Sequence, residues 1–176
     1  MSERASSFGL FSIGAALFFA GYLGVAASDL DFPLLLETLT VLFGLPFVLR
    51  ELRRQTNWLL AAHLILVIPA LHGAAMEAAS WVARSWSTSE SAMFWAGLAG
   101  GFVGALSLLP LAFRRLRSSD PRWGLLASFG IVTLALIGGL VLGFGGNYAL
   151  LAIYPLWQLP FGWFLSRLIR TSPQRP

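Results

Sequence analysis

The stretch WLLAAHLILVIPALHGAAMEAASWV, residues 58–82, contains Glu77 and is otherwise free of Asp, Glu, Lys and Arg. A helix that crosses a hydrocarbon core about 30 Å thick needs roughly 20 apolar residues, so this stretch is long enough to span a bilayer. The whole chain is 57% apolar and 11% charged, whereas about a quarter of the residues in a soluble domain are charged. We therefore expect an all-α integral membrane protein.

Apolar stretches of this kind follow one another along the 176 residues. They predict a single domain of six transmembrane helices arranged as three hairpins. The connections SDLD (28–31) and GFGGN (143–147) are short, which favours tight hairpins for the first and last pairs. The predicted spans are residues 8–27, 32–49, 58–82, 92–113, 123–144 and 148–166.

The basic residues predict the orientation. The chain has 12 Arg and no Lys, and eleven of the arginines lie toward the termini or in the loops RELRRQ (50–55) and RRLRSSDPR (114–122). Arg84 alone falls on the other side. Because cytoplasmic loops are enriched in basic residues, we predict that both termini are cytoplasmic. The expected location is a bacterial-type inner (plasma) membrane, crossed several times.

Missing residue types and motifs exclude several kinds of chemistry. Without Lys there is no Schiff-base or pyridoxal site, and without Cys there is no disulfide, thiol nucleophile or iron–sulfur cluster. The chain also lacks GxSxG, P-loop and HExxH motifs. We expect no enzyme activity, no cofactor, no bound metal and no nucleic-acid partner.

The two histidines lie in one predicted helix, on either side of Pro69. His63 and His72 are nine residues apart, which places them about 13.5 Å apart along the axis and on opposite helix faces. They therefore cannot bind one metal or one haem together. Pro69 is expected to bend the helix and to free the carbonyl of Ile65.

Three ionisable residues form the candidate site. Glu37 and Glu77 each lie five residues from the outer end of a predicted span, at about the same depth, and His72 lies deeper. Ionisable side chains are costly in a bilayer and are usually paired, protonated or directed into a cavity. We hypothesise that the two carboxyl groups share a proton that His72 exchanges. Alternatively, both glutamates reach the outer headgroups and His72 bonds a free carbonyl.

The last predicted span is the second candidate. It contains Pro155 and Pro160, and we expect these two prolines to bend or break the helix. Interrupted helices line many transporter sites, so the neighbouring polar residues are candidates for cavity lining. An alternative is a kinked helix that wraps around its neighbours. The candidate lining residues are Asn147, Tyr154 and Gln158.

Small residues spaced four apart predict close helix packing. The glycines concerned are Gly97, Gly100, Gly101, Gly104, Gly139 and Gly143, and Ala16, Ala20 and Gly24 show the same spacing in the first span. The pattern leaves open whether the partner is a helix of this chain, a second copy or another subunit. A Leu-Pro pair also precedes an arginine-rich span end at Pro46, Pro110 and Pro160. The pattern indicates either three parallel repeats or the usual composition of span ends.

Two functions remain open at this point. The first is a small transport or solute-binding membrane protein, with or without coupling to protons, in which the ionisable residues form the site. The second is an accessory or scaffold subunit of a larger membrane complex, for which the glycine-rich helices and the missing motifs are equally suitable. The expected partners are the lipid bilayer and, through the glycine-rich helices, other membrane subunits or a second copy.

Overall fold

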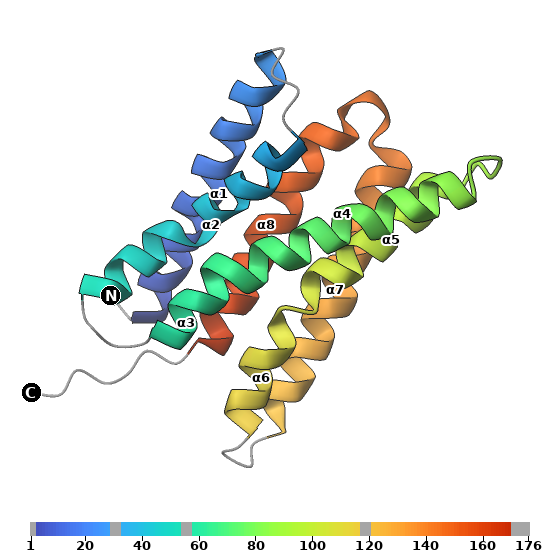
Figure 1. Cartoon of the computed structure of the whole chain (residues 1–176). Coiled ribbons are helices and arrows are strands. Elements are labelled where there is room, and N and C mark those ends of the chain that lie inside the picture. The colour runs from blue at the N-terminus through green and yellow to red at the C-terminus, as the bar shows by residue number, and fades with distance from the viewer. Residues whose placement is uncertain (1–2, 29–32, 54–57, 117–120, 170–176) are drawn as a thin grey trace, which may run out of the picture.

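A computed structural model describes residues 3–28, 33–53, 58–116 and 121–169, apart from the side chains at 3–6, 26, 33–38 and 114–116. These residues form helices and turns without a strand (Figure 1), which confirms the predicted all-α class. The helices are α1 (Glu3–Ala27), α2 (Pro33–Arg53), α3 (Trp58–Ala62), α4 (Ile68–Ser85), α5 (Ala92–Ala105), α6 (Leu108–Leu116), α7 (Arg122–Phe144) and α8 (Ala149–Leu168). A π-helical turn η1 (His63–Val67) joins α3 to α4, and a 3-10 turn η2 (Gly146–Tyr148) precedes α8.

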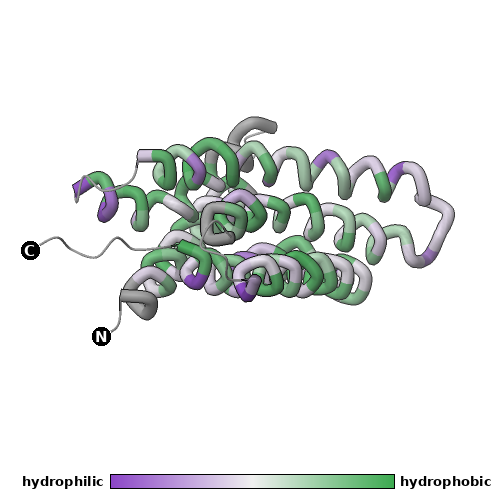
Figure 2. The backbone as a smooth tube through the Cα atoms, turned by 90° about the horizontal axis from the view of Figure 1, so that it is seen from below, coloured by the Kyte–Doolittle hydropathy of each residue, from purple (hydrophilic) through white to green (hydrophobic). Residues whose placement is uncertain are grey.

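Within the described residues, five helical segments are long and apolar enough to cross a membrane. They are Ser7–Val25, Trp58–Ser85, Ala92–Phe113, Arg122–Phe144 and Gly146–Leu168. Figure 2 shows hydrophobic residues along most of the length of these helices. The remaining predicted span, 32–49, is covered by α2, which has 21 residues and is not one of these five segments.

The helices close into a ring. Neighbours in the chain pack together as α1 with α2, α4 with α5, and α7 with α8. Between these hairpins, α2 contacts η1 and α4, α5 lies along α7, and α8 lies along α1 (Figure 1). This arrangement leaves an interior that the inward faces of the helices must fill.

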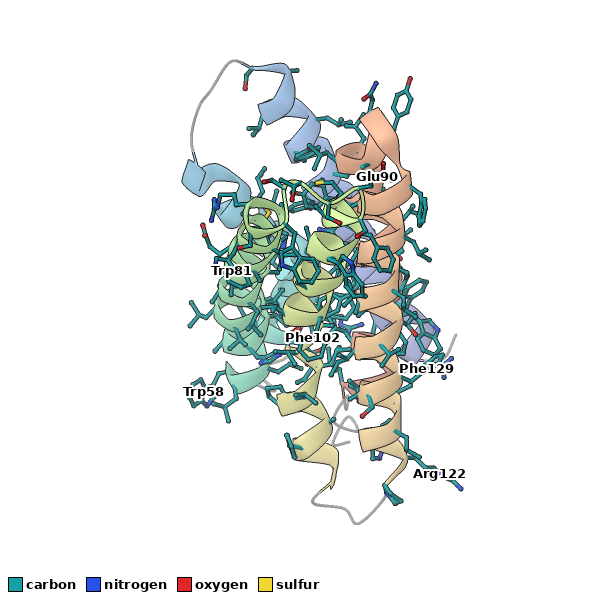
Figure 3. All side chains as sticks on the ribbon, turned by 90° about the vertical axis from the view of Figure 1, so that its right-hand side faces the viewer. Trp58, Trp81, Glu90, Phe102, Arg122 and Phe129 are labelled. Atoms are coloured by element: carbon teal, nitrogen blue, oxygen red, sulfur yellow. The ribbon has the colours of Figure 1, made fainter. Side chains whose placement is uncertain are left out.

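The two ends of the ring differ in charge. Arg50 and Arg53 lie in the last turn of α2 and Arg167 in the last turn of α8, while Arg122 begins α7. Figure 1 places these helix ends on one side of the molecule, here named the basic end. Figure 3 shows Arg122 at this end and Glu90 at the other, here named the opposite end.

The fourth predicted span, 92–113, is two helices with a break at Leu106 and Ser107. Pro110 has no N–H to donate to the carbonyl of Leu106, and the N–H of Leu109 bonds that carbonyl instead, at 3.0 Å. Before Pro69, the N–H of Ile68 bonds the carbonyl of His63, as a π-helical turn requires. Both prolines therefore change the backbone pattern on their N-terminal side.

The last span is not broken, and whether it is bent, the other expected form, stays a prediction. α8 is one continuous element from Ala149 to Leu168, with Pro155 and Pro160 inside it. Because α1 and α7 pack along α8 from both sides, tertiary contacts hold the chain helical despite the missing donors. The irregular backbone lies instead in the third and fourth spans.

Glycines allow backbone contact between helices. A Cβ atom added at Gly97 would overlap the carbonyl of Gly138 on α7, and one at Gly101 would lie 2.6 Å from the carbonyl oxygen of Leu134. Gly100 faces α4, whereas Gly139 and Gly143 face Phe94 and Gly104 faces Trp157. In the first span the close contact is made by Gly14, against the backbone of Phe43. Ala16, Ala20 and Gly24, which the spacing favoured, are exposed.

Candidate functional site

A cavity of about 270 Å³ lies between α4, α5, α7 and α8, close to the lower limit of the ~300–1,000 Å³ usual for small-molecule sites. One wall consists of small residues at helical spacing on α4 and α5, namely Ala75, Ala79, Ala83, Gly97, Gly100 and Gly104. The facing wall consists of larger α8 side chains, namely Ile153, Tyr154, Trp157 and Gln158. Short side chains on α4 and α5 therefore line the side of the cavity that faces α8.

The cavity has its mouth at the opposite end of the ring. Ala83 near the end of α4, Met93 near the start of α5 and Leu150 near the start of α8 all line it. The side chains of Met93 and Leu150 are 46% and 61% exposed. The exposed lining between these three helix ends is here named the mouth of the cavity.

Three residues that line the cavity each have a buried polar atom without a hydrogen-bond partner among the described residues. Gln158 is only 6% exposed, and its Oε1 has no hydrogen-bond partner among the described residues. The same is true of Nε2 of His72 and Nε1 of Trp157. A buried polar group without a partner costs free energy, typically about 1–3 kcal/mol, so three such atoms beside one cavity are unusual.

A second, smaller space adjoins the cavity on the other side of these residues. It measures about 20 Å³ and is lined by Thr40 of α2 together with His72, Trp157 and Gln158. This volume admits about one water molecule, which needs ~10–15 Å³. His72 and Gln158 therefore separate a large apolar space from a small polar one.

Aromatic side chains close the cavity toward α1. The ring centroid of Tyr154 lies 5.0 Å from that of Phe18, 4.7 Å from that of Tyr22 and 6.1 Å from that of His72. The hydroxyl of Tyr154 lies 3.9 Å from the Sδ atom of Met76, a weak contact. Tyr154 thus forms the part of the wall that lies beside the imidazole of His72.

The cavity is closed toward the basic end. Trp157 stacks on Phe161 with centroids 4.7 Å apart, and Phe161 packs on Phe43 at 5.6 Å. Phe11 continues the column, 5.5 Å from Phe43 and 5.1 Å from Phe47. All four phenylalanines are at most 2% exposed. This column fills the interior, so the cavity opens at one end of the ring.

His63 has a structural position. It is buried in η1, and its Nε2 donates a hydrogen bond to the carbonyl oxygen of Ser107 at 3.1 Å. Ser107 lies at the break between α5 and α6 and is itself fully buried. His63 therefore ties the irregular turn of one span to the broken backbone of the next, well away from the cavity lining.

The structure brings together part of the expected site. His72, Tyr154 and Gln158 all line the cavity. Glu77 is exposed and does not line it, and Asn147 is exposed in η2 and does not line it either. The side chain of Glu37 lies outside the described residues. Glu77 therefore lies on the outward face of α4, and the expected group of two carboxyls and one imidazole stays a prediction.

The site is suited to hydrogen bonding and apolar contact. Its described lining residues include no Asp, Glu, Lys or Arg. Among the described residues, moreover, no three His, Cys, Asp or Glu side chains come together as a metal site would require.

Sequence reasoning missed Trp157 and the small wall. The alanines of α4 and glycines of α5 recur every three or four residues in adjacent spans, and this matching pattern was the signal available for the wall. The comparisons add nothing to this picture, since no protein-family model, curated protein or solved structure matches the chain.

Proposed function

We propose that this chain is an integral membrane protein that binds a small solute inside its helix ring and carries it across the bilayer. The observation that supports solute binding is the cavity lined by Gln158, whose Oε1 is buried without a described partner. In a ring that served packing alone, a bulky apolar side chain at this position would fill the space at lower cost.

Membrane insertion is supported by the outer surface. Large apolar side chains are exposed over several helices, including Phe102, Leu125, Phe129, Leu136, Leu140 and Phe144. Soluble proteins do not expose apolar surface continuously on this scale. With the arginines at one end, the positive-inside rule gives an orientation in which the mouth of the cavity is on the outer side.

One of the arguments for the scaffold alternative, the glycine-rich helices, is weaker. The glycines that pointed to a partner subunit face other helices of this chain, as Gly97 does with Gly138 and Gly143 with Phe94. Coupling to protons depended on carboxyl groups near His72 and stays a prediction, because Glu77 lies outside the cavity lining and the side chain of Glu37 lies outside the described residues.

A matched pair of variants tests solute binding. Ala83→Phe places a ring in the mouth of the cavity, whereas Ala74→Phe places the same ring on the exposed face of the same helix. Protein purified from membranes in mild detergent would be examined by mass spectrometry for retained small molecules. We expect Ala74→Phe to retain the wild-type compound and Ala83→Phe to lose it. Identical retention in all three proteins would contradict binding in this cavity.

The compound found in this way then serves to test transport. Counterflow of the labelled compound in proteoliposomes should occur with wild-type protein and with Ala74→Phe, and should be abolished in Ala83→Phe. Binding without counterflow would restrict the function to solute capture.

Cysteine labelling tests the orientation. The chain has no cysteine, so single substitutions give clean signals. We expect Ser87→Cys, in the connection between α4 and α5, to react with an impermeant thiol reagent in intact cells. Ser118→Cys, in the arginine-rich loop 114–122, should react only after lysis. The reverse pattern would invert the orientation and place the mouth on the cytoplasmic side.

A further inference from the structure

We propose that the cavity takes an uncharged amphipathic molecule whose polar end both donates and accepts hydrogen bonds, as an alcohol or a primary amide does. Its apolar body points toward the mouth. This inference rests on the proposed function, because it names the class of solute that the same cavity would bind.

Three residues that line the cavity, His72, Trp157 and Gln158, define the polar end. Oε1 of Gln158 can only accept a hydrogen bond, and Nε1 of Trp157 can only donate one. Nε2 of His72 can do either, depending on the tautomer. These atoms are themselves buried, and a ligand that pairs with both Gln158 and Trp157 must offer a donor and an acceptor. A ketone or an ether lacks the donor, and a hydrocarbon lacks both.

The position of these residues sets the direction of the ligand. His72, Trp157 and Gln158 line both the large cavity and the adjoining small space, so they lie at the inner limit of the cavity. The aromatic column begins next to them on the side of the basic end, where Trp157 stacks on Phe161. The polar end consequently lies deep in the ring, and the rest of the molecule extends toward Met93 and Leu150.

The walls along this path are apolar. Ala75 and Ala79 line it on α4, Leu142 lines it on α7 and Ile153 lines it on α8. Met76 and Met93 border the same space, and methionine adapts its shape to varied apolar partners. A linear aliphatic body is therefore suited to this part of the cavity.

The charge of the lining favours an uncharged ligand. Among the described lining residues there is no Asp or Glu to pair with a cation and no Lys or Arg to pair with an anion. Burying an ion without a countercharge is strongly unfavourable. His72 is the one side chain that could supply a positive charge, and an anionic probe therefore belongs in the test.

Four probes with the same eight-carbon chain separate the classes. They are octanamide, octanoate, octylammonium and octane. Ser80→Cys places a thiol in the cavity with little change in volume, and Ser87→Cys places one in the exposed connection between α4 and α5. With the protein in lipid nanodiscs, each probe would be titrated against labelling by N-ethylmaleimide. The control thiol corrects for any direct effect of the probe on the labelling reaction.

We expect octanamide to protect Ser80→Cys and to leave Ser87→Cys reactive. Octanoate and octylammonium should need at least about ten times the concentration of octanamide. Burying an ion without a countercharge is unfavourable, and a loss of about 1.4 kcal/mol already corresponds to a tenfold change. Equal protection by either ion would overturn the uncharged class while leaving the cavity as a binding site. Failure of all four probes to protect the cavity thiol would overturn the proposed function itself.

A second set of variants tests the polar end. Gln158→Met keeps a long side chain and removes the acceptor, and it should raise the half-protecting concentration of octanamide about two- to tenfold. Protection by octane should not change. Asn147→Leu removes an amide outside the cavity and should change neither value. If Gln158→Met does not fold, Trp157→Phe removes the donor and keeps a ring. Unchanged octanamide protection in the folded variant would overturn the assigned polar end.

Discussion

The interior of the helix ring is filled toward the basic end and hollow toward the opposite end. Each of these two halves contains one of the two histidines. Toward the basic end, a column of aromatic side chains fills the space and His63 bonds a backbone carbonyl. Toward the opposite end, small residues leave a cavity, and Nε2 of His72 has no partner among the described residues. The difference teaches that a histidine beside a cavity is informative about function when its buried ring nitrogen has no described partner, whereas one that bonds a carbonyl serves the fold.

The largest loss of stability is expected when a side chain is removed from the filled half. Phe161 is 1% exposed and lies between Trp157 and Phe43 in the aromatic column. Phe161→Ala should lower the free energy of unfolding by about 3–5 kcal/mol, because a large cavity replaces the ring. Thermal unfolding in detergent measures this. Phe102→Ala, at an exposed ring on α5, is the matched control and should have little effect. Equal effects of the two variants would remove the contrast between core and surface.

The next effect concerns the histidine of the filled half. His63→Leu removes the donor to the buried carbonyl of Ser107 and should cost about 1–3 kcal/mol. His63→Gln retains a side-chain N–H and should recover part of this loss. The measurement is again thermal unfolding, and the protection by octanamide should stay unchanged because His63 does not line the cavity. A stable His63→Leu protein would show that the break at Ser107 needs no support.

The histidine of the hollow half should behave in the opposite way. His72→Leu removes a polar atom that has no described partner and should leave the free energy of unfolding within about 1 kcal/mol of wild type, or raise it. Octanamide protection of the cavity thiol should weaken. A loss of stability as large as that of His63→Leu would mean that His72 is a structural residue, and the distinction between the two halves would fall.

Much of the fold could be predicted from local sequence. The length of each apolar run and the arginines at its ends predict helices, and the described bounds lie near the expected ones, as for 123–144 and Arg122–Phe144. The interruptions could not be placed in the same way. Pro110 and Pro160 both remove a donor, yet the helix breaks near the first and continues through the second. Whether a proline interrupts a helix depends on which neighbours pack around it.

The site was predicted in part for a related reason. Helical periodicity shows that His72 and Glu77 lie on different faces of one helix, but the periodicity does not say which face is inward. That choice depends on α5 and α8, whose contacts are long-range. The small wall and the facing Tyr154, Trp157 and Gln158 decide it, and they place His72 inside and Glu77 outside.

The smallest effect is therefore expected at Glu77, where the original hypothesis placed a proton-sharing carboxyl group. Glu77 is exposed on α4 and outside the cavity lining, so Glu77→Gln removes a charge without changing the polar end of the site. We expect unchanged octanamide protection and unfolding within about 0.5 kcal/mol of wild type, as for most surface substitutions. Gln158→Met is the comparison, since it changes one inward polar group on the facing helix. If Glu77→Gln weakens protection as strongly as Gln158→Met does, the carboxyl group acts on the cavity from outside its lining, and a proton-linked site would have to be reconsidered. If protection is unchanged, the polar contacts of the cavity come from His72, Trp157 and Gln158, and the carboxyl group of Glu77 is only a surface group of α4.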